Sequence, residues 1–101
     1  MQIQVRADND RIVEQASQLL RFYLAELEGD VDRIIIGIDY ARDRLGVRQY
    51  RCQVGIRCLY GRRLHIEETQ SDLAPAVTRA LDRSIRTLRR RAKLRRHARC
   101  A

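Results

Sequence analysis

The middle of the sequence alternates between apolar and polar residues in three successive runs, and this pattern limits the fold more than any other feature. The runs cover 33–40, 50–58 and 64–66, and polar or glycine-containing stretches separate them at 42–46 and 60–63. Because side chains of a strand point alternately to its two faces, each run predicts a strand with one buried face. Short turns join antiparallel neighbours. The middle of the chain therefore predicts an antiparallel meander, in which the last two strands form a hairpin.

A shorter alternation and a helical pattern precede these strands. Apolar residues alternate with polar ones over 2–7, which predicts a short half-buried strand. The acidic and amide residues at 8–10 are N-cap candidates, and apolar residues then recur at helical spacing as far as Gly29, a typical stop. We therefore expect this strand to join the antiparallel sheet and to be followed by one helix over about 11–28.

A second and longer helix is predicted from Leu73 onward. Asp72 is a good N-cap, and Pro75 lies in the first turn, where the missing N–H costs little. One face of this helix is apolar or small and should pack on the sheet beside the first helix. The helix would be roughly 35 Å long, enough to outreach the sheet. The residues of its apolar face are Leu73, Val77, Ala80, Leu81, Ser84, Ile85, Leu88 and Ala92.

The net positive charge of the chain comes from residues 73–101, the segment that contains this helix. Residues 1–72 hold eleven arginines and twelve carboxylates, a net −1, whereas residues 73–101 hold ten arginines or lysines and one carboxylate, a net +9. On the face opposite the apolar one, cationic and histidine side chains recur at steps of three and four and form one stripe. The stripe is Arg79, Arg83, Arg86, Arg90, Lys93 and His97, and Arg89 and Arg96 flank it.

This asymmetry of charge indicates a polyanionic partner. Nucleic acid is favoured over a membrane surface, since insertion into a membrane would need a further apolar face. Only five aromatic residues are present, and Tyr40 and Tyr50 are expected to point inward, so base-specific stacking is not predicted. What remains is contact with the phosphates of a folded RNA, to which the 42–48 loop and the turn at Arg62 and Arg63 would add. A merely solvated basic face remains an alternative.

No constellation of residues predicts an enzyme, a cofactor or a metal site. His65 is expected on the outward face of its strand. Glu67 and Glu68 follow one another in the same strand and point to opposite faces, so they would not share a proton. We therefore expect a binding protein that uses no cofactor, no metal ion and no small-molecule substrate.

The three cysteines indicate reduced thiols in a cytoplasmic protein. They form no CxxC pair and have no histidines at metal-ligand spacing. Cys52 and Cys58 lie six residues apart in one predicted strand, so both should face the core. The sequence opens on a strand pattern and not on a signal peptide, and it contains no apolar run of about 18 residues, so no membrane segment is expected.

These elements predict an α+β fold of order β-α-β-β-β-α, a four-stranded sheet with two helices packed on one face. The order is similar to the double-stranded-RNA-binding shape with an extra leading strand. A chain of 101 residues has room for one core. We expect a single RNA-binding domain over 1–101, whose second helix becomes a basic C-terminal extension from about Arg83.

Several short stretches also occur in an order that is typical of one known family. They are 1–5, 27–28, 31–34, 61–65 and, in the second predicted helix, 72–90. They span nearly the whole chain, and their weight comes from their joint order. Because these stretches occur in this order, the chain resembles the short ribosome hibernation factors, the family of hibernation-promoting factor and ribosome-associated translation inhibitor. It differs from the family pattern on the first helix, where Tyr23 and Glu26 stand in place of lysines.

The resemblance implies a protein that binds the small ribosomal subunit and its RNA in the channel of messenger and transfer RNA, and that blocks translation in stationary phase or stress. It also implies a short form, without the second domain by which long members pair ribosomes. The alternatives are a general RNA-binding domain without ribosome specificity and a protein-interaction module that docks on an acidic partner. The residues expected to contact RNA are Arg79, Arg83, Arg86, Arg89, Arg90, Lys93, Arg96, Arg62 and Arg63.

Overall fold

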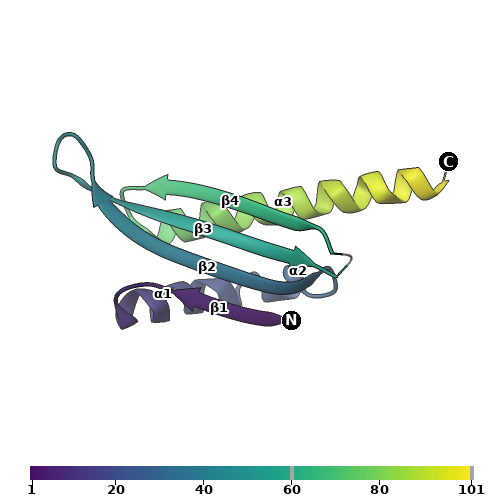
Figure 1. Cartoon of the computed structure of the whole chain (residues 1–101), viewed down its shortest axis with the longest axis horizontal. Coiled ribbons are helices and arrows are strands. Elements are labelled where there is room, and N and C mark those ends of the chain that lie inside the picture. The colour runs from purple at the N-terminus through teal and green to yellow at the C-terminus, as the bar shows by residue number, and fades with distance from the viewer. Residues whose placement is uncertain (60, 101) are drawn as a thin grey trace.

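The computed structural model describes residues 1–59 and 61–100, with side chains as far as Leu94. Within these residues seven elements follow one another along the chain (Figure 1). The predicted order of strands and helices is confirmed, with the first helix divided in two. In chain order the elements are β1 (Gln2–Arg6), α1 (Asp10–Arg21), α2 (Leu24–Leu27), β2 (Val31–Arg42), β3 (Arg48–Cys58), β4 (Arg63–Gln70) and α3 (Leu73–Cys100).

The four strands of the described chain form one mixed sheet in the order β1-β2-β3-β4. β2, β3 and β4 are antiparallel neighbours, with Ile36 opposite Val54 and Val54 opposite Ile66, as the alternation predicts. β1 instead runs parallel to β2, with Val5 opposite Ile36. The expectation of a wholly antiparallel meander is therefore wrong for this pair. The chain returns from β1 through two helices, and a helical crossover brings the next strand into parallel alignment.

The first predicted helix is interrupted, so the expectation of one continuous helix is wrong. α1 begins after Asn9, whose Oδ1 accepts a hydrogen bond from the backbone N–H of Arg11 at 2.7 Å. At the other end, the N–H groups of Phe22 and Tyr23 bond three residues back, at 3.2 and 2.9 Å. These bonds tighten the last turn and end α1, and α2 follows as one separate turn. Gly29 then ends the helical region with a positive φ of 94°.

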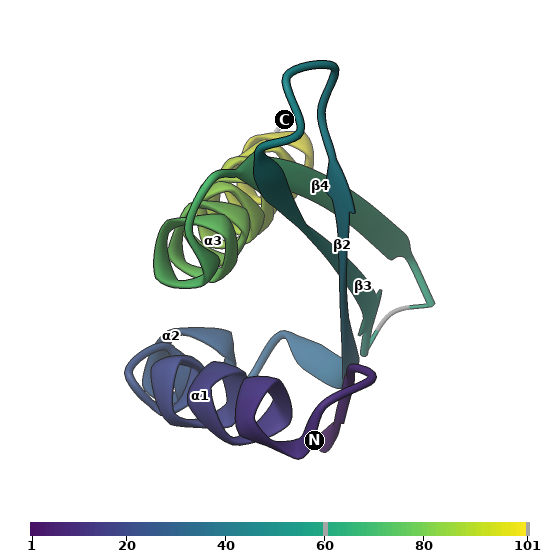
Figure 2. The same cartoon turned by 90° about the vertical axis from the view of Figure 1, so that its left-hand side faces the viewer.

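The helices cover one face of the sheet, as predicted (Figure 2). α3 packs against β3 and β4, whereas α1 packs beside β1 and against α3. The core lies between the sheet and these helices. Ser84 is buried within it, and its hydroxyl donates to the backbone O of Ala80 at 2.7 Å, which satisfies the buried polar group. The fully buried side chains include Leu27, Ile34, Ile36, Val54, Val77 and Leu81.

The molecule is elongated, with extents of 53, 26 and 20 Å along its principal axes. Figure 1 shows α3 continuing beyond one end of the sheet, as its length predicts. At the other end, the hairpin between β2 and β3 projects past the packed helices. The two ends of the long axis therefore carry two different projecting elements.

The tyrosines at the hairpin end differ from the expectation that both point inward. Tyr50 packs partly against the core, whereas Tyr40, opposite it in the β2–β3 register, is 48% exposed. The two ring centroids lie 6.1 Å apart. The prediction was wrong for Tyr40 because alternation gives the face of a strand but not where the covering helices end.

Candidate nucleic-acid interface

The outer face of α3 carries the row of cations that the sequence predicts. Helical geometry puts this row opposite the buried face, which includes Val77, Leu81 and Leu88. From its first member to Lys93 the row extends roughly 21 Å along the helix axis. The stripe residues whose side chains are described are all exposed, and they are Arg79, Arg83, Arg86, Arg90 and Lys93. The predicted side chains of Arg96 and His97 lie outside the described residues.

Arg83 is bound to β4 by two hydrogen bonds. Its Nη1 donates to Oε2 of Glu68 at 2.7 Å and to the backbone O of Glu67 at 2.8 Å. Glu68 faces the helix whereas the Glu67 side chain is exposed, as their alternation predicts. The hydrogen bond from Arg83, and after it one from Gln70, holds the pKa of Glu68 below its ordinary value. Arg83, which spacing assigns to the RNA-facing stripe, therefore also joins α3 to the sheet.

Two neighbouring arginines are also engaged with the protein. Nη2 of Arg89 lies 2.8 Å from Oε2 of Glu26, which joins α3 to α2. Glu26, one of the two positions at which the sequence differs from the expected family pattern, is thus part of an internal ion pair. Nη1 of Arg91 donates to the backbone O of Arg63 at 3.1 Å, at the start of β4.

Sequence analysis did not select Arg91 as a residue of interest. A usable signal was present, because three successive arginines at 89–91 cannot share one face of a helix. At about 100° per residue, Arg91 falls between the stripe and the apolar face, where a long side chain reaches the edge of the sheet.

Four other cations of the stripe differ from these arginines. Within the described residues they take part in no ion pair and no side-chain hydrogen bond, and all four are exposed. Their charge is therefore presented to solvent along one line, where a polyanion can approach them. These four residues, which we call the outer row, are Arg79, Arg86, Arg90 and Lys93.

The turn between β3 and β4 brings two more of the predicted cations near the distal part of α3. Arg62 and Arg63 are both exposed. The hydrogen bond from Arg91 to the backbone O of Arg63 shows that this turn lies beside the helix. The predicted 42–48 loop is different, because it lies at the opposite end of the long axis (Figure 1). The structure therefore places the backbone of this turn beside α3, whereas the Arg63 side chain lines a hollow on the opposite face of the sheet, and the loop is separated from both.

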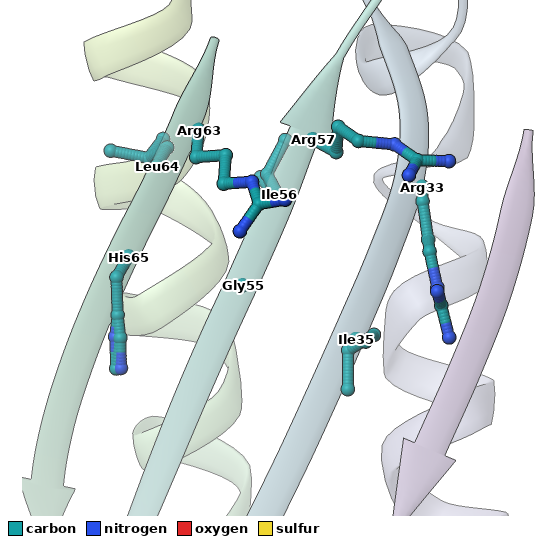
Figure 3. Close-up of a pocket in the computed structure, with 8 residues that line it drawn as sticks. All are labelled: Arg33, Ile35, Gly55, Ile56, Arg57, Arg63, Leu64 and His65. Carbon is teal, nitrogen blue, oxygen red and sulfur yellow. The ribbon is translucent and has the colours of Figure 1, made fainter. Parts of the chain in front are cut away.

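The face of the sheet away from the helices carries a shallow hollow, shown in Figure 3. Ile35 and Gly55 lie at its floor, and arginines of β2, β3 and β4 stand around it. One of them, Arg57, is bound through Nη2 to Oδ2 of Asp32 at 2.7 Å. His65 is exposed at the rim, as its alternation predicts. The hollow brings together cations and apolar groups but no pair of an acid and a base.

The buried thiols belong to the core, as predicted. Cys52 and Cys58 are both buried and free. Burial raises the pKa of Cys52 to about 12, so this thiol stays protonated at neutral pH. Among the side chains that the structure describes, no three His, Cys, Asp or Glu residues gather where they could hold a metal ion. None of the described helices is both long and apolar enough to span a lipid bilayer.

The sheet order and the one-sided helical layer define the class of this chain, an α+β domain whose fold is shared by two solved structures. The N-terminal domain of Protein Y from Thermus thermophilus is similar, with a TM-score of 0.63, 20% identity, and coverage of 88% of this chain and 93% of that one. A ribosomal subunit interface protein from Coxiella burnetii is also similar, with a TM-score of 0.65, 12% identity, and coverage of 91% and 96%.

No family model and no curated protein matches the sequence. Because the two solved structures are only 20% and 12% identical in sequence to this chain, their similarity establishes the fold alone. It therefore confirms, at the level of the fold, the resemblance that the order of the sequence motifs indicates.

Proposed function

We propose that this chain is a ribosome-associated translation inhibitor that binds RNA of the small ribosomal subunit through α3. The observation that carries the proposal is the outer row, four exposed cations along one helix face with no partner among the described side chains. Phosphates of a folded RNA are the ligand that matches a line of fixed positive charge. The fold supports the ribosome as the source of that RNA, because one similar structure is named a ribosomal subunit interface protein.

Inhibition would be steric and would involve no chemistry. The chain would occupy the channel of messenger and transfer RNA, act in the cytoplasm during stationary phase or stress, and need no cofactor. In this proposal 1–101 acts as one RNA-binding domain, and its basic extension begins at about Arg83. The outer row makes the main phosphate contacts, and further contacts come from Arg62, Arg63, Arg83, Arg89 and Arg96.

The internal ion pairs divide these contacts into two kinds. A phosphate that binds Arg83 or Arg89 competes with Glu68 or Glu26, or else uses the guanidinium N–H groups that these carboxylates leave open. No residue of the outer row forms such an ion pair with a described side chain, although Arg79 is close enough to Glu68 to add to the lowering of its pKa. We therefore expect the outer row to contribute more to affinity for each charge than the two paired arginines do.

The first test is sedimentation of the tagged protein in lysate from stationary-phase cells, at near-physiological and at high salt. Co-migration with small subunits or whole ribosomes that is lost at high salt is the expected result. A variant in which the outer row is changed to glutamine should remain at the top of the gradient. Wild-type protein at the top of the gradient under both conditions would contradict the proposal.

Two further measurements separate this function from its rivals. A ribosome-specific factor should resist competition by bulk transfer RNA, which displaces a general RNA-binding protein. Subunits loaded beforehand with messenger RNA and initiator transfer RNA should not bind the chain, if it occupies the same channel. Co-purification of a protein partner that survives nuclease treatment would instead favour docking on an acidic protein surface.

A further inference from the structure

The hairpin between β2 and β3 presents an apolar side chain at the tip of a projecting element. All residues from 39 to 48 are exposed, and Figures 1 and 2 show the hairpin extending away from the rest of the molecule. Leu45 is 88% exposed, the highest value among the large apolar side chains that are described as exposed. Val47, two residues further on, is 49% exposed. A single exposed apolar residue is ordinary, but Leu45 and Val47 both lie exposed in one projecting turn, so the tip is a candidate contact surface.

The turn that carries Leu45 is held by Asp43. Oδ1 of Asp43 accepts hydrogen bonds from the backbone N–H groups of Leu45 and Val47, both at 2.9 Å. The backbone N–H of Asp43 donates to Val47 O at 2.8 Å, and that of Gly46 donates to Asp43 O at 3.0 Å. Gly46 has a positive φ of 80°, which glycine adopts without strain. Four hydrogen bonds thus fix the backbone of the turn that carries Leu45, which lowers the entropy that the backbone loses when the tip binds a partner.

The apolar tip is surrounded by arginines. The 42–48 segment has three arginines and one aspartate, a net charge of +2, and its single carboxylate is turned into the loop. Nη1 of Arg42 donates to Gly46 O at 3.1 Å. The guanidinium carbon of Arg48 lies 4.5 Å from the centroid of the Tyr40 ring, which holds this cation beside the hairpin. Arg44 is exposed next to Leu45. A partner of this tip must therefore offer negative charge on both sides of an apolar group.

We propose that this hairpin is a second RNA contact, in which Leu45 packs against an unpaired base while Arg44 and Arg48 bind the flanking phosphates. The inference rests on the proposed function and adds a second contact site to it. An unpaired base in a loop or bulge has an exposed apolar face between two phosphates, which matches the tip in both shape and charge. Because the hairpin and the distal part of α3 lie at opposite ends of a 53 Å axis, the two contacts reach separate segments of RNA.

The test compares Leu45→Ala with Phe22→Ala in binding to purified small ribosomal subunits. Phe22 is a suitable control because its ring is 81% exposed and it lies at the end of α1, to which neither proposal assigns an RNA contact. Leu45→Ala should weaken binding roughly 15- to 60-fold, as the loss of two to three buried carbon groups predicts. It should leave the dependence of affinity on salt unchanged because no charge is removed. Phe22→Ala should bind as wild type does.

Chemical probing of the RNA in the same complexes shows where the contact lies. Wild-type protein should protect two sets of nucleotides. Leu45→Ala should expose the first set, and only substitutions in the outer row should expose the second. Equal binding and equal protection by Leu45→Ala and Phe22→Ala, with wild type bound, would overturn the hairpin contact and leave the proposed function standing. A nuclease-resistant cross-link from position 45 to a ribosomal protein would overturn the choice of RNA. No binding by wild type would overturn both proposals.

Discussion

Nη1 of Arg83 lies 2.7 Å from Oε2 of Glu68, so a cation on the exposed side of α3 is held by the sheet beneath it. The Glu68 side chain is only 16% exposed, whereas that of Arg83 is 46% exposed. The hydrogen bond from Arg83 is the main cause of the lowered pKa of this carboxylate. This contact therefore links the charge of the proposed RNA-binding helix to the stability of the fold.

The first prediction concerns Glu68→Gln. In the folded state the pKa of Glu68 lies below its ordinary value of about 4.3, so its contribution to stability is present above that value. The contribution is lost as the pH falls through the lowered folded pKa. Urea unfolding should show Glu68→Gln less stable than wild type at neutral pH, with a difference that shrinks steadily below about pH 4. A difference that stays constant over this range would mean that the ion pair contributes nothing.

The second prediction compares two double variants that remove the same charge. Arg86→Gln with Arg90→Gln removes two members of the outer row, and should reduce the slope of log affinity against log salt by about 1.4 to 1.8. Arg83→Gln with Arg89→Gln should change this slope less, because these arginines are paired with Glu68 and Glu26. Fluorescence anisotropy with a labelled ribosomal RNA fragment at several salt concentrations measures both slopes. Equal slopes for the two variants would contradict the division between paired and outer cations.

The third prediction concerns the packing of α3 on the sheet. Leu81 is fully buried, so Leu81→Ala should lower the free energy of unfolding by about 2–5 kcal/mol. Leu94, on the same helix, is 63% exposed, and Leu94→Ala should change the free energy of unfolding by no more than about 0.5 kcal/mol. Urea unfolding of both variants measures the two effects. Similar losses would mean that the distal turns of α3 are packed as tightly as the proximal ones.

The fourth prediction concerns the reactivity of the core thiols. Because burial raises the pKa of Cys52 to about 12, almost none of this thiol is in the reactive thiolate form near neutral pH. In a Cys100→Ser background, the folded protein should react very slowly with a thiol reagent. Addition of denaturant should make both Cys52 and Cys58 reactive. Rapid reaction of the folded protein would show that β3 opens readily.

The elements that could be predicted from the sequence depend on local patterns. The alternation over 50–58 gives β3 and the burial of Cys52 and Val54 in it, since the face of a strand follows directly from its period. The start of α3 at Leu73 follows from the cap residue before it. Each of these features depends on residues close together in the chain, so no knowledge of distant contacts was needed.

The predictions that were wrong concern features that depend on the arrangement of distant segments. The alternation of Ile3 and Val5 identifies β1 but holds no information on its direction, which the helical crossover to β2 determines. The helical pattern of the first helix continues through Phe22, although the backbone tightens there and leaves this ring 81% exposed. Tyr40 was assigned to the interior because the extent of the helical layer cannot be read from β2 alone.

The sequence locates the cationic face of α3 but does not show which of its arginines have an internal partner. Spacing by three and four finds the exposed face of α3. It does not show that Arg89 meets Glu26, 63 residues away, or that Arg83 meets Glu68, 15 residues away. Those pairs separate the outer row from arginines with an internal partner. Charge counting alone treats all of these cations as equivalent.

The hydrogen bonds from Arg83 and Arg91 to the backbone of β4 also affect how copies of this chain behave toward one another. β4 is an outer strand of the sheet, and an uncovered outer strand is a template onto which a strand of another molecule can add. The two guanidinium groups donate to the carbonyl oxygens of Glu67 and Arg63, to which the N–H groups of such an added strand would otherwise bond. One helix thus carries arginines with two roles. Substitution of the outer row leaves these two hydrogen bonds in place, whereas we expect the loss of both Arg83 and Arg91 to leave the two carbonyl groups open to a strand of another molecule.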